Sequence, residues 1–126
     1  MDKNQAFTDG MAANAALAAA SEKLVRLREQ RRLLDAALPA IKADAETKII
    51  EDAGGWKDYG SNDTERKRKL ELAMAGDVAY TSSLERVSEL GLQIDLQSIV
   101  VEQLRRDVRL YTALAGGYSI NISGGK

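Results

Sequence analysis

Two long stretches of the sequence repeat apolar residues at alternating spacings of three and four, the pattern of a helix that buries one narrow stripe. The first stripe consists of Leu17, Ala20, Leu24, Leu27, Arg31, Leu34, Leu38, Ile41 and Ala45. The second consists of Val87, Leu90, Ile94, Gln97, Val101, Leu104, Val108, Tyr111 and Ala115. Because a strand would need a period of two, these stripes predict an all-α fold with two long helices that face each other.

Glycines, short polar residues and one proline set the expected ends of the elements. Thr8 or Asp9 would cap the first helix, and Asn62 and Asp77 would cap the two later ones. Pro39 predicts a kink, because the first stripe continues beyond it. The expected elements are a long helix over 8–53, a tip loop over 54–62, a short helix over 63–75, a long helix over 77–115 and a strand over 118–123.

These elements predict a single domain over 1–126, built as a long antiparallel helical hairpin, a coiled coil with a short tip helix and a short C-terminal β-strand. A two-helix hairpin leaves much apolar surface exposed to water, so we expect self-association into a homo-oligomer. The second helix widens its apolar stripe at Leu92, Leu96, Ile99 and Val100, which we predict to form the oligomer seam.

Composition excludes several chemistries. The chain has no Cys and no His, so thiolate nucleophiles, imidazole relays and the usual zinc sites cannot form. Pairs of carboxylates occur at helical spacing, but ordinary charged helix faces produce such pairs freely. The glycine pairs lack the Gly-Lys-Ser/Thr of a phosphate loop. We therefore expect no enzyme, no cofactor and no metal.

A basic cluster next to two aromatic residues marks the tip. Aromatic side chains and arginine dominate the binding energy of many protein interfaces, and cations with aromatic rings also suit unpaired bases. The structural alternative is a solvated first helical turn with the aromatic residues packed onto the hairpin. The predicted partner-binding residues are Trp56, Tyr59, Arg66, Lys67, Arg68 and Lys69.

A second group of arginines depends on how the two helices align. If Ala53 faces Asp77, arginines of both helices reach the same level and form one belt that could bind an anion or nucleic acid. Carboxylates on the same faces could instead neutralise that belt, and Arg31 on the stripe could set the register. The belt residues are Arg26, Arg28, Arg32, Arg105, Arg106 and Arg109.

The apolar stretch from Met11 to Ala20 is mostly alanine and is too short for a membrane helix or a signal-peptide core. The net charge of −1 argues against bulk attraction to nucleic acid or anionic lipid. We therefore expect a cytoplasmic protein without a membrane partner.

The middle of the chain resembles a group of short helical-hairpin proteins of phages and integrated elements. Their shared pattern is a Gly-x-Asn-x-x-Glu-Arg-Lys tip, a short helix, and an Asp and an aromatic residue that open the second arm. The match covers about residues 56–114 and rests on Gly60, Asn62, Glu65, Arg66, Lys67, Asp77 and Tyr80. The resemblance implies a phage or mobile-element setting in the host cell and no defined activity.

The leading hypothesis is therefore a non-enzymatic, self-associating hairpin that binds a host or phage protein through its tip and inhibits a host defence protein. The first alternative is a nucleic-acid-binding accessory factor in phage recombination, which would use the arginine belt. The second is a structural virion or scaffold component, which would assemble through the terminal strand.

Overall fold

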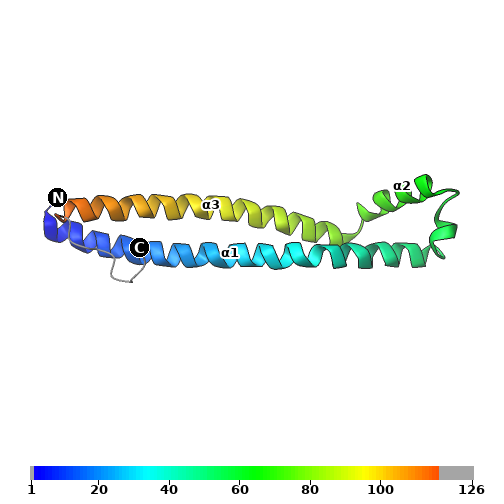
Figure 1. The fold of residues 1–126 in the computed structure, drawn as a ribbon, viewed down its shortest axis with the longest axis horizontal. Helices are drawn as coiled ribbons and strands as arrows, with labels where there is room; N and C mark the ends of the chain where they lie inside the picture. Colours follow the sequence, from blue (N-terminus) through cyan, green and yellow to red (C-terminus); the bar gives the residue numbers. More distant parts are fainter. Residues whose placement is uncertain (1, 117–126) are drawn as a thin grey trace. The chain divides into compact units, whose positions relative to one another are not determined.

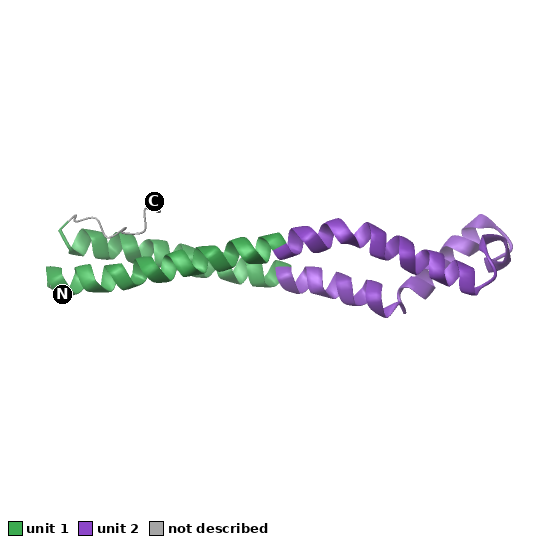
Figure 2. Cartoon of the chain, turned by 90° about the horizontal axis from the view of Figure 1, so that it is seen from below, with its two compact units in different colours: residues 1–29, 91–126 green, residues 30–90 purple. Residues whose placement is uncertain are grey.

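The computed structural model describes residues 2–116, and the strand expected over 118–123 lies outside them. Within the described residues the fold is all-α, as predicted, and no strand is present. The chain divides into two compact units (Figure 2). Unit 1 comprises residues 1–29 and 91–126, and unit 2 comprises residues 30–90. The two long helices pack together within these units (Figure 1).

Helix α1 spans Lys3–Asp52, so it starts earlier than the predicted cap at Thr8 or Asp9. Asp2 caps it instead, because its Oδ1 accepts a hydrogen bond from the Gln5 backbone N–H at 2.7 Å. Thr8 and Asp9 are internal to the helix and bond to side chains or carbonyls one turn back. Pro39 lies inside α1 with its ring exposed and does not end the helix.

The glycine pair ends α1 as expected. Gly54 and Gly55 have φ angles of 92° and 113°, a region that favours glycine. The Gly55 N–H donates to the Ile50 carbonyl at 2.9 Å, which satisfies one of the last carbonyls of the helix. The chain is thereby turned into a short 3-10 helix, η1, over Trp56–Tyr59.

The two later helices begin at the predicted caps. Helix α2 spans Asp63–Met74, and Asn62 Oδ1 accepts from the Glu65 backbone N–H at 2.9 Å. Helix α3 spans Val78–Leu114, and Asp77 Oδ1 accepts from the Tyr80 N–H at 2.8 Å. Both caps satisfy backbone donors that an unflanked helix would leave unpaired.

Unit 1 is a two-helix layer in which the predicted stripes meet. Ala20, Leu24 and Val101 form one buried cluster, with Leu17, Ile94 and Leu104 packed against it. The polar member of the second stripe, Gln97, donates from Nε2 to the Ala20 carbonyl at 3.0 Å. The stripe therefore tolerates a polar residue, because the amide finds a backbone partner across the helix pair.

Unit 2 contains the second half of α1, η1, α2 and the first turns of α3 (Figure 2). Helix α2 runs back beside α1, since Lys42 and Glu46 of α1 border the same groove as Met74 of α2. The turn is therefore the segment 53–62, and α2 belongs to the returning arm. The sequence analysis had instead placed α2 beyond the two arms.

The alignment of the helices in unit 1 corrects the predicted one. If Ala53 faced Asp77, Ala115 would lie opposite Ala15. The structure instead packs Ala115 against Ala6 in a buried cluster. The difference is about nine residues, or ~13 Å along the helix axis. The prediction was wrong because α2 takes up part of the returning arm, which shifts the arm along α1.

Candidate protein-binding site on α2

The turn of unit 2 is stabilised by contacts between an aromatic pair and one arginine. Trp56 and Tyr59 stack with ring centroids 6.4 Å apart and an interplanar angle of 18°. The Arg66 guanidinium lies over the Trp56 ring at 5.9 Å from its centroid. These three side chains come from η1 and from the first turns of α2, so they tie the turn to the helix that follows it.

Arg66 also holds the backbone of the turn. Its Nε donates to the Gly60 carbonyl at 3.1 Å, and its Nη2 donates to the Lys57 carbonyl at 3.4 Å. Its Nη1 pairs with Asp63 at 3.0 Å, and only 18% of the side chain is exposed. Of the predicted partner-binding residues, Arg66 is therefore directed inward, and each of its three side-chain nitrogens already donates within the chain.

Gly60 permits this close approach. A Cβ atom added at Gly60 would lie 3.1 Å from Arg66 Cγ and 3.2 Å from the Arg66 backbone nitrogen. Such contacts are tighter than ordinary van der Waals packing, so Arg66 would have to shift by a few tenths of an ångström. The glycine of the tip therefore makes room for the arginine.

The remaining cations of the tip project from α2. Lys67, Arg68 and Lys69 are all exposed, and Lys69 pairs with Glu65 at 3.5 Å. Leu72 lies one turn after Arg68 and is 67% exposed, although it is a large apolar residue. The sequence analysis missed Leu72, and its spacing of four from Arg68 was the available signal.

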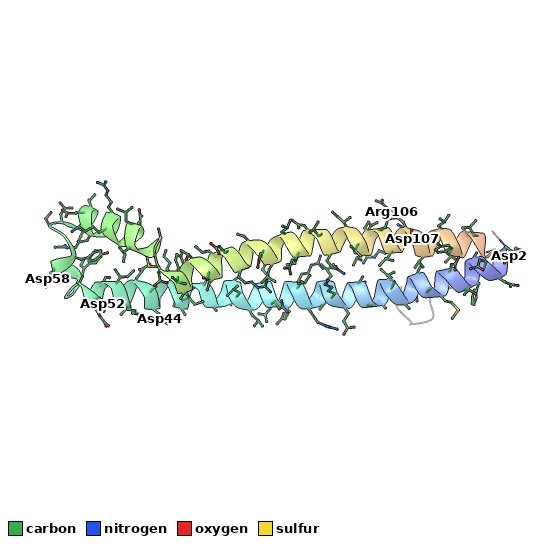
Figure 3. The ribbon with its side chains drawn as sticks, turned by 180° about the vertical axis from the view of Figure 1, so that it is seen from behind. Asp2, Asp44, Asp52, Asp58, Arg106 and Asp107 are labelled. Carbon is green, nitrogen blue, oxygen red and sulfur yellow. The ribbon has the colours of Figure 1, made fainter. Side chains whose placement is uncertain are left out.

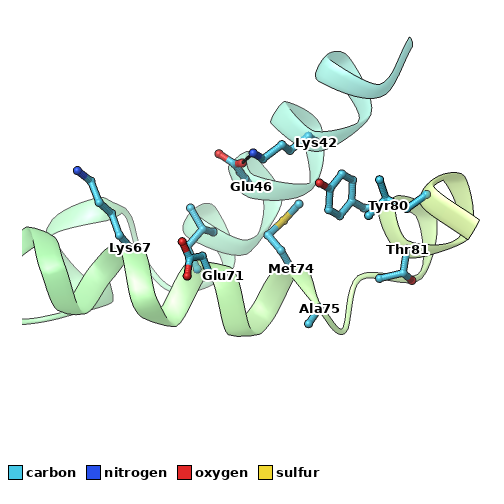
Figure 4. A pocket seen from close by; sticks show the side chains of 10 residues that line it. Lys42, Glu46, Lys67, Glu71, Met74, Ala75, Tyr80 and Thr81 are labelled. Carbon is cyan, nitrogen blue, oxygen red and sulfur yellow. Dashed lines mark ion pairs between the residues drawn. The ribbon is translucent and has the colours of Figure 1, made fainter. Parts of the chain in front are cut away.

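A groove of about 440 Å³ lies on the other side of α2, within unit 2 (Figure 4). Met74 of α2 and Tyr80 of α3 point toward Lys42 and Glu46 of α1, which pair at 3.9 Å. Its walls are largely apolar, and its residues are Lys42, Glu46, Lys67, Leu70, Glu71, Met74, Ala75, Tyr80, Thr81 and Leu84. Lys67 thus borders the groove, while Arg68 and Leu72 line a shallow hollow on the outer side of α2.

One carboxyl group of the site has a shifted pKa. The Ser61 hydroxyl, which donates to Glu65 Oε2, lowers the pKa of Glu65, with smaller contributions from the Ser61 backbone N–H and from Lys69. A lowered pKa means that the folded tip favours the ionised carboxylate. The stabilisation is complete above the ordinary pKa of a glutamate and is lost as the pH falls through the lowered value.

Replacing Ser61 with alanine should therefore raise the pKa of Glu65 toward its ordinary value, because the hydroxyl that lowers this pKa most is removed. NMR titration of the Glu65 side-chain carboxyl carbon measures this directly. Ser83→Ala is the matched control, since the Ser83 hydroxyl donates to the Ala79 carbonyl and not to a carboxylate. An unchanged Glu65 titration in Ser61→Ala would contradict the assignment.

The arginine belt does not form at one level in unit 1. With Ala6 opposite Ala115, the segment 105–109 lies at about the level of residues 12–16 of α1, ~15–25 Å along the axis from Arg26 and Arg28. Arg31 and Arg32 belong to unit 2. The predicted belt therefore fails for the same reason as the predicted alignment.

Several of these arginines also pair with carboxylates on their own helix, as the neutralised alternative expected. Arg26 pairs with Glu22 at 2.6 Å, and Glu102 receives both Arg105 at 3.6 Å and Arg109 at 3.7 Å. Arg31, the residue suggested to set the register, lies 3.7 Å from Asp35, and 46% of its side chain is exposed. Exposed pairs of this kind stabilise a helix weakly.

Comparison of the chain with family models, curated proteins and solved structures finds no match. Among residues 2–116, no three His, Cys, Asp or Glu side chains are grouped so that they could hold a metal ion. No helix in this part of the chain combines the length and the apolar character that crossing a membrane requires.

Proposed function

We propose that this chain is a non-enzymatic interaction protein that binds a partner protein through α2. The observation that carries the proposal is the set of contacts among Trp56, Tyr59 and Arg66, which ties the start of α2 to the turn. Arg68 and Leu72 remain exposed on the same helix. A rigid element that presents an apolar side chain beside a cation loses little entropy on binding. In the setting that the resemblance implies, the partner is a host or phage protein, and binding inhibits it.

The charges of the tip define the kind of partner. The segment 56–75 carries five cations and four carboxylates, so it is not basic as a whole. Asp63 and Glu65 are paired with Arg66 and Lys69, which leaves Lys67 and Arg68 as the outward cations of α2. We therefore expect an acidic protein surface with an apolar pocket that receives Leu72.

Reversing one charge on α2 tests this surface. Arg68→Glu and Leu72→Ala should each weaken binding of the partner by about tenfold or more, because one removes the charge match and the other the apolar anchor. The partner is first identified by mass spectrometry after a photo-crosslinking residue is placed at position 64, on the same face of α2. Affinity is then measured between the purified proteins.

Arg86→Glu is the matched control, since Arg86 is an exposed arginine of α3 in unit 2 that pairs with Glu89 at 3.0 Å. It should leave the affinity unchanged. Equal affinities for the wild type and Arg68→Glu would exclude α2 as the contact surface. Salt-sensitive binding of single-stranded DNA by the wild type, lost in Arg68→Glu, would favour the nucleic-acid alternative instead.

A further inference from the structure

Helix α3 carries a second apolar stripe in unit 1, apart from the one that meets α1. Its side chains are between 42% and 65% exposed, and they are Leu92, Leu96, Ile99, Val100, Leu110 and Leu114. Gln103 continues the same line, four residues after Ile99 and seven before Leu110. The stripe is ~33 Å long at 1.5 Å per residue, which is the length of a helix-packing surface. Four of its members are the predicted oligomer seam.

The four leucines of the stripe are symmetric about Gln103, whereas Ile99 and Val100 have Asp107 and Arg106 as their counterparts. Leu92 and Leu114 lie eleven residues to either side of Gln103, and Leu96 and Leu110 lie seven residues to either side. We propose that two copies of the chain pair antiparallel through α3, with the two-fold axis at Gln103. This pairing places leucine against leucine at four levels and brings the two Gln103 side chains together, where one polar position fixes the register.

The pairing nearer the axis is amphipathic. Arg106 lies three residues after Gln103 and Val100 three residues before it, so the aliphatic stem of Arg106 covers Val100 of the second copy. Arg106 points away from α1 in Figure 3, as this contact requires. It forms no ion pair within residues 2–116 and is therefore available to the second copy.

Charges along one flank of the stripe favour the antiparallel direction. Acids come first and bases follow, in the order Asp95, Glu102, Arg106 and Arg109. An antiparallel pair centred on Gln103 brings Asp95 of one copy within ~3 Å, along the axis, of the level of Arg109 in the other. Glu102 and Arg106 meet in the same way. In a parallel pair this flank would face the opposite flank of the second copy, so these acids and bases would not be brought together.

Single-cysteine variants test the geometry cleanly, because the sequence contains no Cys. Under mild oxidation Gln103→Cys should form a covalent dimer, since the two thiols face each other at the axis. Leu96→Cys alone and Leu110→Cys alone should remain uncrosslinked, whereas a mixture of the two, one of them tagged, should give the mixed dimer. Efficient crosslinking of Leu96→Cys with itself would overturn the antiparallel arrangement.

Sedimentation of the full chain tests the association itself. The wild type should sediment as a dimer, and the double variant Leu96→Glu/Leu110→Glu should sediment as a monomer with its helical circular dichroism retained. Val25→Glu is the matched control, because Val25 is 63% exposed on α1, and it should stay dimeric. A wild type that is monomeric even at about 0.1 mM would overturn the proposal.

This inference does not rest on the proposed function. The stripe lies in unit 1 and the α2 surface lies in unit 2. Loss of the dimer in Leu96→Glu/Leu110→Glu and loss of partner binding in Arg68→Glu are therefore separate results, and either can fail while the other holds.

Discussion

Replacing Leu24 with alanine should lower the free energy of unfolding by about 2 to 4 kcal/mol. Leu24 is 7% exposed and belongs to the buried cluster with Ala20 and Val101 in unit 1. The substitution removes apolar burial and leaves a space that a layer of two helices closes only in part. Chemical denaturation followed by far-ultraviolet circular dichroism measures the change, at one fixed protein concentration because any association adds to the apparent stability.

The expected loss is large because the core of this chain is small. Within the described residues, the buried apolar side chains larger than alanine are few, and they are Leu24, Leu27, Met74, Leu90 and Val101. Leu33→Ala is the matched control, since Leu33 is 56% exposed on the same helix, and it should change the stability by no more than ~0.5 kcal/mol. If Leu24→Ala and Leu33→Ala had equal effects, the predicted seam would not be the core.

Features that depend on neighbouring residues could be predicted from the sequence. The caps Asn62 and Asp77 and the glycine end of α1 are each decided within about four residues, and the structure confirms all three. The start of α1 was missed because Asp2 offers an earlier cap of the same chemistry. The residues around Thr8 do not show that Asp2 is the better N-cap for α1.

Features that depend on contacts between distant residues could not be predicted in the same way. The alignment of α1 and α3 depends on where α2 packs, and the sequence carries no local signal for that choice. The arginine belt depended on the alignment and was wrong with it. The inward direction of Arg66 could not be predicted for a similar reason. Only the folded turn brings the carbonyls of Lys57 and Gly60 to its guanidinium.

The fold class, by contrast, follows from the stripes themselves. Ala20, Leu24 and Leu27 of the first stripe and Leu90 and Val101 of the second are buried, as a period between three and four predicts. The stripe pattern does not determine the register between the two helices, since a seam of small and branched side chains is compatible with several registers. The Gln97 hydrogen bond to the Ala20 carbonyl is one contact that distinguishes the observed register from the others.

Replacing Arg66 with alanine should loosen the turn of unit 2 and leave the rest of the fold in place. The variant loses the hydrogen bonds to the carbonyls of Gly60 and Lys57, the ion pair with Asp63 and the contact with the Trp56 ring. Hydrogen bonds from a charged donor contribute ~1.5–3 kcal/mol each when partly buried. Because these bonds share one side chain and are not additive, we expect a local loss of about 2 kcal/mol.

Trp56 reports this change directly, since it is the one tryptophan of the sequence. Its emission should shift to longer wavelength and its quenching by acrylamide should increase, while amide exchange over 56–66 should accelerate about tenfold or more. Arg66→Lys should recover little, because an ammonium cannot reach two carbonyls and a ring with the geometry of a planar fork. Arg68→Ala, two residues on, should leave the emission unchanged.

The same variants separate a positioning role from a contact role in partner binding. Arg66→Ala should weaken binding together with the change in Trp56 emission, because α2 is no longer held, whereas Arg68→Glu should weaken binding with the emission intact. If Arg66→Ala kept both the wild-type emission and the wild-type exchange rates, the contacts of Arg66 would not stabilise the turn. The rigidity that the proposed function requires would then have to come from the groove contacts of Met74 and Tyr80.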